Sequence, residues 1–97
     1  MDNRMDDRIE EIRKKIGVCD DIIIKQLVDR MECIQEIIAY KKQNGIPILQ
    51  PEQEKKQEDN LKQKLGDNAF EEEILNIFKY IVKNSRKIQA KALFNYN

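Results

Sequence analysis

Two cations, Arg30 and Lys41, interrupt an apolar stripe in the stretch LVDRMECIQEIIAYK at residues 27–41. The apolar residues of this stretch recur every three or four positions, which predicts a helix with one buried face. At about 100° per residue, the 11-residue separation between the two cations brings them within roughly 20° of the same direction. Each alone can reach solvent or pair with an acid. Two on one side of a helix are also suited to binding an anion.

Polar side chains interrupt the apolar faces of two further expected helices. Ser85 and Gln89 are spaced i, i+4 on one apolar face, and Glu54 lies on another. An interhelical hydrogen bond would account for Ser85 and Gln89 without a ligand. An ion pair with Arg30 or Lys41 would likewise account for the Glu54 carboxylate without a ligand. Together, these side chains predict a polar site built from three helices.

Arg13 is a third cation that can serve such a site, but only from a second copy of the chain. It precedes Arg30 by 17 residues, which rotates it by roughly 100° on the same helix. Burying unpaired charge costs several kcal/mol, so a cluster of this kind usually has an anionic guest. Because the cations outnumber the single acid, we expect a guest with more than one negative group.

Composition excludes several classes of protein. The chain has 97 residues, which predicts a single domain over residues 1–97, and it is 40% hydrophobic and 37% charged. Eighteen basic residues balance eighteen acidic ones, so no basic excess marks a binder of nucleic acid or of a membrane surface. No apolar run approaches the roughly 18 residues of a membrane span, and the N-terminal MDNRMDDR does not resemble a signal peptide. We therefore expect a soluble, cytoplasmic protein.

Histidine and cysteine usage limits the chemistry further. The chain has no histidine, which removes the commonest general base and the commonest metal ligand. Cys19 and Cys33 are 14 residues apart in one helical pattern, roughly 21 Å along the axis, which is too far for a disulfide. We expect both to be small buried side chains in a reducing compartment.

The first expected helix runs from about residue 6 to residue 42. Gly17 is the one residue in this range that disfavours a helix. At about 37 residues and 55 Å, it is much longer than the usual globular helix. Its apolar seam includes Ile9, Ile12, Ile16 and Ile23, and the remainder of the chain is too short to bury it. A symmetric dimer is the simplest solution.

Two shorter helices follow. Gly45 is the expected left-handed cap of the first helix, and Gln50 the N-cap of a second helix over residues 51–65. Asn68 followed by Glu71 is a capping-box pattern for a third helix over about residues 69–94, and residues 95–97 are expected to fray. No strand alternation is visible. The sequence therefore predicts an all-α chain of three helices.

These residues resemble the all-helical chorismate mutase family in their order and spacing along nearly the whole chain. The resemblance implies three helices per chain, intertwined as a homodimer in which the long first helices cross between two equivalent sites. It implies rearrangement of chorismate to prephenate in phenylalanine and tyrosine biosynthesis, a reaction within one molecule that needs no cofactor, metal or general base. The segments that carry the resemblance are IRKKI at 12–16, VDRM at 28–31, YK at 40–41, GIPI at 45–48, PEQE at 51–54 and NSRKIQ at 84–89.

The resemblance also implies a role for each polar residue that interrupts the apolar faces. Arg30 is expected to hold one substrate carboxylate. Arg13 of the partner subunit is expected to hold the other side of the substrate. Lys41 and Gln89 are expected to donate hydrogen bonds to the ether oxygen, which gains negative charge in the transition state. Lys41 also contacts a carboxylate.

The substrate-binding set departs from the family pattern at two positions. Glu54 is expected to accept the ring hydroxyl, and Ser85 to line the carboxylate pocket. The family commonly has Asp-Pro-x-Arg-Glu where this chain has Gln50 and Gln53. Gln50 is a poorer N-cap than aspartate. Gln53 removes one charge-assisted contact, worth about 1.5–3 kcal/mol if buried, which predicts weakened substrate binding.

Three alternatives remain open. The first is a lyase on the same scaffold that splits isochorismate into salicylate and pyruvate, although Glu54, commonly lost in that branch, favours the mutase. The second is a weakly active or non-catalytic helical partner of another shikimate-pathway enzyme, which the changes at Gln50 and Gln53 make reasonable. The third is a helical dimer without a ligand, which leaves the cation cluster unexplained.

Overall fold

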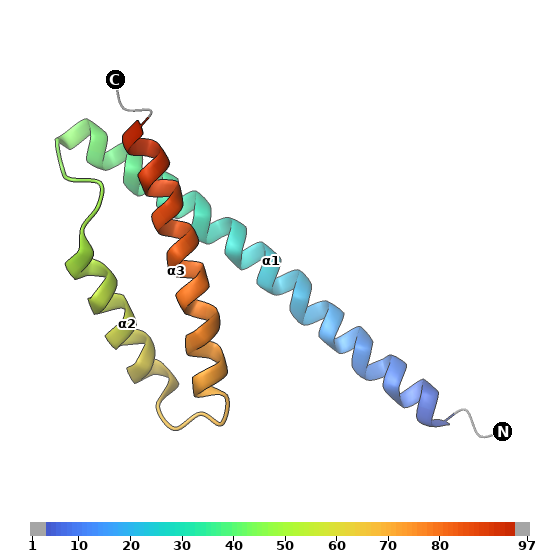
Figure 1. Cartoon of the computed structure of the whole chain (residues 1–97). Coiled ribbons are helices and arrows are strands. Elements are labelled where there is room, and N and C mark those ends of the chain that lie inside the picture. The colour runs from blue at the N-terminus through green and yellow to red at the C-terminus, as the bar shows by residue number, and fades with distance from the viewer. Residues whose placement is uncertain (1–3, 95–97) are drawn as a thin grey trace. The chain divides into compact units, whose positions relative to one another are not determined.

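The structure is a computed structural model in which residues 4–94 are described. Three α-helices are present in this range: α1 (Arg4–Asn44), α2 (Pro51–Leu65) and α3 (Glu71–Phe94) (Figure 1). No strand occurs between residues 4 and 94. The prediction of an all-α chain of three helices is therefore confirmed. The tail expected to fray lies outside the described residues.

The chain divides into two compact units, Met1–Glu32 and Cys33–Asn97, which we describe separately. The described part of the first unit is the N-terminal portion of α1. Asp6 and Asp7 lie in its first turn, where carboxylates favour the positive end of the helix dipole. Gly17 does not interrupt the helix, and a Cβ atom built on it would meet nothing within 4 Å. The whole helix, Arg4–Asn44, extends two residues beyond the expected range of 6–42 at each end.

The predicted apolar seam of the first unit is exposed in the single chain. Ile9, Ile12, Ile16 and Ile23 are each between 43% and 54% exposed. A side chain of this size contributes roughly 1.5–3 kcal/mol only when it is fully buried. In the single chain, these four side chains therefore contribute less than that to stability.

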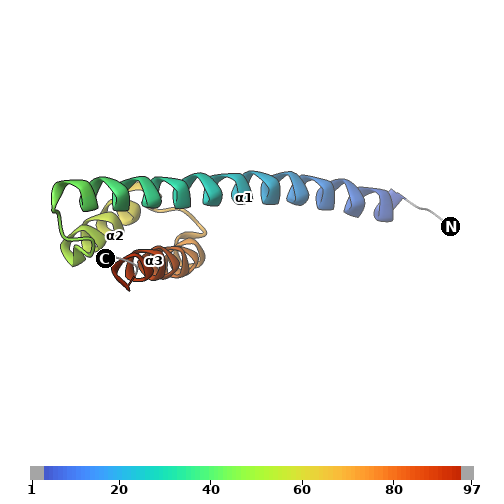
Figure 2. The same cartoon turned by 90° about the horizontal axis from the view of Figure 1, so that it is seen from above.

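The second unit contains the end of α1 together with α2 and α3. The two shorter helices contact each other, and both views show them side by side (Figures 1 and 2). Ile38 on α1 and Ile48 on the connection to α2 are 7% and 5% exposed, and they are the buried apolar side chains among residues 4–94. The core of a single chain is therefore very small.

A Schellman motif ends α1. Gly45 has a φ of 65°, and the backbone N–H of Ile46 donates to the carbonyl oxygen of Lys41 at 2.9 Å. The left-handed cap predicted at Gly45 is confirmed. The chain then runs through residues 46–50 to Pro51 in the first turn of α2. Gln50 is the N-cap of α2 and makes no capping hydrogen bond with its side chain, as expected for glutamine.

The start of α3 differs from the predicted one. The helix begins at Glu71 and not near Ala69. The Asn68 side-chain oxygen accepts the backbone N–H of Phe70 at 2.8 Å, so it bonds two residues ahead. The capping box needs a bond three residues ahead. Asn68 therefore makes a local turn, which delays the helix.

Both cysteines are free, as predicted, but both are exposed in the single chain. The prediction that Cys19 and Cys33 are buried is therefore wrong for one chain. The physical reason is that both lie on α1, whose apolar seam the described residues leave largely uncovered.

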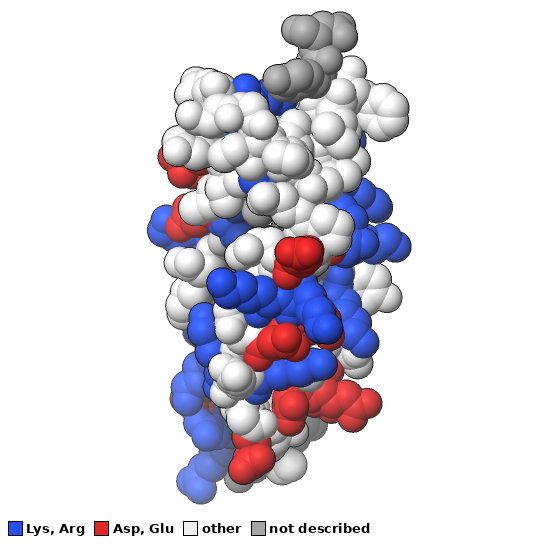
Figure 3. Space-filling view, turned by 90° about the vertical axis from the view of Figure 1, so that its left-hand side faces the viewer, with Lys and Arg blue, Asp and Glu red and all other residues white. Residues whose placement is uncertain are grey.

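Charged side chains are unevenly placed on the face that Figure 3 shows. Lys, Arg, Asp and Glu side chains are all present over its middle and lower parts, whereas its upper part is almost uncharged. Within residues 4–94, no helix is long and apolar enough to cross a membrane. The same range contains no group of three or more Cys, Asp or Glu side chains placed to hold a metal ion.

Candidate active site

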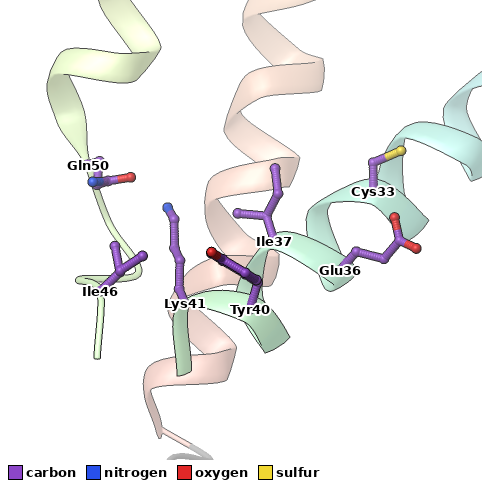
Figure 4. A pocket seen from close by; sticks show the side chains of 7 residues that line it. All are labelled: Cys33, Glu36, Ile37, Tyr40, Lys41, Ile46 and Gln50. Atoms are coloured by element: carbon purple, nitrogen blue, oxygen red, sulfur yellow. The ribbon is translucent and has the colours of Figure 1, made fainter. Parts of the chain in front are cut away.

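An open hollow of about 580 Å³ lies in the second unit, between the end of α1 and the connection to α2 (Figure 4). Its volume falls in the range of about 300–1,000 Å³ that small-molecule sites occupy. Two of the predicted site residues, Lys41 and Gln50, line it. The other lining residues are Cys33, Glu36, Ile37, Tyr40 and Ile46.

Lys41 enters this hollow from the last turn of α1. Its Nζ donates to the backbone carbonyl oxygen of Ile48 at 2.9 Å, and its side chain is half-buried. Figure 4 shows the side chain extending from α1 toward the segment that carries Ile46 and Gln50. An ammonium group has three N–H donors. Two therefore remain for a ligand.

Glu54 pairs with Arg86, across the contact between α2 and α3. Arg86 Nε donates to Glu54 Oε1 at 2.9 Å, and Arg86 Nη2 donates to Glu54 Oε2. The side chains of Arg86 and Glu54 are 56% and 29% exposed. The hydrogen bond to Glu54 and the attraction of its carboxylate raise the pKa of Arg86 above its usual value. The guanidinium therefore stays charged. The sequence suggested Arg30 or Lys41 as the partner of Glu54, and the structure gives Arg86 instead.

Ser85 and Gln89 lie one turn apart on α3. Ser85 is 6% exposed, and its Oγ donates to the carbonyl oxygen of Ile81 at 3.0 Å. This bond is within the helix. Gln89 is half-buried. Ser85 precedes Arg86 in the chain, and the two residues differ in exposure, because Ser85 is buried whereas the Arg86 side chain is 56% exposed.

The remaining predicted residues are more exposed or belong to the first unit. Gln53 is exposed on α2. In the first unit, Arg13 Nη1 donates to Glu10 Oε1 at 2.9 Å, and both side chains are exposed. Arg30 is half-buried. The structure gives the surroundings of Arg13 and Arg30 within the first unit alone, so their place beside Lys41 remains a prediction.

Sequence reasoning missed Arg86 as a partner of Glu54. The signal was present, because Arg86 follows Ser85 in a segment already singled out, and Glu54 was expected to face a neighbouring helix. The spacing of cations along the first helix relates only residues of that helix, so it gives no information on Arg86. The lining residue Tyr40 was also missed, although it precedes Lys41 directly.

Comparisons with known proteins gave a family match and a relative. A family model described as "Chorismate mutase type II" matches residues 12–90. A protein named chorismate mutase from Methanocaldococcus jannaschii is 31% identical over 90 residues, which is 92% of this chain and 91% of that protein. No solved structure matches the chain.

Proposed function

The chain belongs to the chorismate mutase type II family, and on this premise we propose that it rearranges chorismate to prephenate. The match over residues 12–90 is the observation that carries the proposal, because it spans all the predicted site residues. The reaction is a Claisen rearrangement within one dicarboxylate molecule. It requires a compact substrate shape and stabilisation of the ether oxygen as its C–O bond breaks.

The residues fit these two requirements. Positioning of the dianion by cations and hydrogen-bond donors can contribute several kcal/mol to the rate. Lys41 and Gln89 donate to the ether oxygen, where negative charge develops, and therefore bind the transition state more tightly than the substrate. Arg30 binds a carboxylate. The hydrogen bond of Lys41 to Ile48 supports its role, because it holds the ammonium in the hollow.

The substrate-binding residues complete the proposal. Glu54 accepts the ring hydroxyl, and Ser85 lines the carboxylate pocket. Gln50 lines the hollow beside Lys41. Gln53 takes the place of the arginine that the family commonly has, so we propose weaker substrate binding than a chain with arginine there would have.

The active form is a homodimer in this proposal. The exposed isoleucines of α1 supply an apolar seam that a second copy can cover. Arg13 of the partner subunit then reaches the site built on Arg30. Its exposure in the single chain leaves the guanidinium accessible for this role.

An assay of the purified chain with chorismate tests the reaction. We expect loss of chorismate with equal formation of prephenate, detected as phenylpyruvate after acid treatment. A parallel incubation with isochorismate is the control. Release of pyruvate from isochorismate without prephenate formation from chorismate would establish the lyase alternative and contradict the proposal.

Mixing two inactive variants tests the shared site. We expect Arg13→Ala and Arg30→Ala chains each to be strongly impaired, and the mixture to recover up to about a quarter of wild-type activity, since half of randomly mixed dimers carry one intact site of two. The measurement is chorismate turnover after co-refolding. Absence of recovery in a sample that contains heterodimers would show that both arginines serve one chain.

A further inference from the structure

We propose that Arg86 is a positioning residue, which holds the Glu54 carboxylate in the orientation that accepts the ring hydroxyl of chorismate. The inference rests on the proposed function, since it concerns the same site. It adds a residue of α3 to which neither the sequence motifs nor the comparisons gave a role.

The geometry of the pair supports this role. Arg86 Nε and Nη2 each donate to a different oxygen of Glu54. A two-point contact between a planar guanidinium and a carboxylate fixes the plane and the rotation of the carboxylate, which a single bond does not. The two residues lie 32 positions apart, on different helices. Arg86 therefore orients Glu54 from outside its own helix.

The pair leaves Glu54 able to bind a ligand. A carboxylate has about four acceptor sites on its two oxygens, and Arg86 occupies one on each. The Glu54 side chain remains 29% exposed. A hydroxyl group can therefore donate to either oxygen while the contact with Arg86 is kept.

Arg86 is an exposed residue of α3 that follows a buried one. Its neighbour Ser85 is the buried polar residue among residues 4–94 and bonds to the helix backbone. The Arg86 side chain itself is 56% exposed, and exposed ion pairs contribute little to stability. We therefore expect variants at Arg86 to fold, so that a change in activity reports on Glu54.

Steady-state kinetics with two substrates tests the inference. The substrates are chorismate and an analogue in which hydrogen replaces the ring hydroxyl. We expect Arg86→Gln to lower kcat/KM for chorismate by about 10-fold, the size of a weakened charge-assisted bond, and to leave the analogue within about twofold of wild type. Arg86→Lys should recover part of the loss. Lys87→Gln, which removes the same charge one residue away, is the matched control and should leave both values unchanged.

A double-mutant cycle separates positioning from a general effect of charge. If Arg86 acts through Glu54, the Glu54→Gln, Arg86→Gln double variant is no worse than Glu54→Gln alone. Additive losses, or an equal loss with both substrates, would overturn the inference. A wild-type chain without activity on chorismate would remove the proposed function and this inference together. An active wild type in which Arg86→Gln behaves like Lys87→Gln would remove the inference alone.

Discussion

Lys41 is held in place by a hydrogen bond to the protein backbone. Its bond to the carbonyl oxygen of Ile48 fixes the ammonium at the edge of the hollow. A donor that is already oriented loses little freedom when charge develops nearby, and such groups account for much of enzymatic rate acceleration. This bond therefore supports the role in transition-state stabilisation that we propose for Lys41.

Removal of the two proposed donors should affect turnover more than substrate binding. We expect Lys41→Ala and Gln89→Ala to lower kcat by about 100- to 1,000-fold, because each removes a contact that strengthens in the transition state. The measurement is steady-state kinetics with chorismate. Circular dichroism and sizing of each variant serve as the control for folding, and unchanged kcat in a folded variant would refute the assigned role.

Gln53 should limit substrate affinity. We expect Gln53→Arg to lower KM for chorismate by about 10-fold, because arginine restores one charge-assisted contact with a carboxylate. Gln57→Arg adds the same charge one turn further along α2 and is the matched control, since Gln57 is also exposed. An equal fall in KM in both variants would point to general electrostatic attraction of the dianion.

Single residues show what spacing within one helix can and cannot predict. The i, i+4 spacing placed Ser85 and Gln89 on one face of a helix, and the structure has them one turn apart on α3. The partner of Glu54 could not be obtained in this way. It depends on how α2 contacts α3, and the spacing of residues within one helix holds no information about another helix.

At the scale of elements, the connection between α1 and α2 organises the hollow. Gly45 turns the chain out of α1, and Ile48 buries its side chain while its carbonyl oxygen binds Lys41. The same residue therefore fixes the path of the connection and the position of the lysine.

Truncation of Ile48 should destabilise the fold and lower activity. We expect Ile48→Ala to reduce the free energy of unfolding by about 2–4 kcal/mol, because it empties a buried position. Leu49→Ala, at a position 38% exposed, is the control and should cost much less. Urea denaturation of both variants at equal protein concentration provides the measurement, and equal losses would contradict the burial seen for Ile48.

The helices were predictable from sequence to within a few residues. Apolar spacing and Gly45 gave α1, and Pro51 gave the first residue of α2. The start of α3 was two residues off, because Asn68 can bond either two or three residues ahead and sequence does not decide between these bonds.

At the scale of the whole molecule, the single chain buries very little apolar surface. Ile38 and Ile48 are its buried apolar side chains among residues 4–94, whereas large apolar side chains along α1 are exposed. A chain of 97 residues is marginally stable even with a well-formed core. We therefore expect folding to be coupled to association.

Coupling of this kind makes stability depend on protein concentration. We expect Tm to rise by several degrees over a 100-fold increase in concentration, as mass action requires for a folded dimer that unfolds to monomers. Ile23→Glu, on the exposed seam, should lower Tm and shift the sample toward monomer in light scattering.

Lys25→Gln is the control for this variant. It changes the net charge by the same amount, at an exposed position about 200° around the helix from Ile23. A Tm independent of concentration, or an equal effect of the two variants, would rule out a dimer held by the α1 seam.

The path of the connection also bears on how such chains can vary in length. Surface connections usually accept insertions, because little depends on where they run. Here one added residue between Gly45 and Ile48 would move either the buried side chain or the carbonyl oxygen that binds Lys41. Exchanges of exposed residues such as Leu49 should be tolerated, whereas gaps should not. Homologous chains that keep this lysine should therefore differ in the composition of this segment far more than in its number of residues.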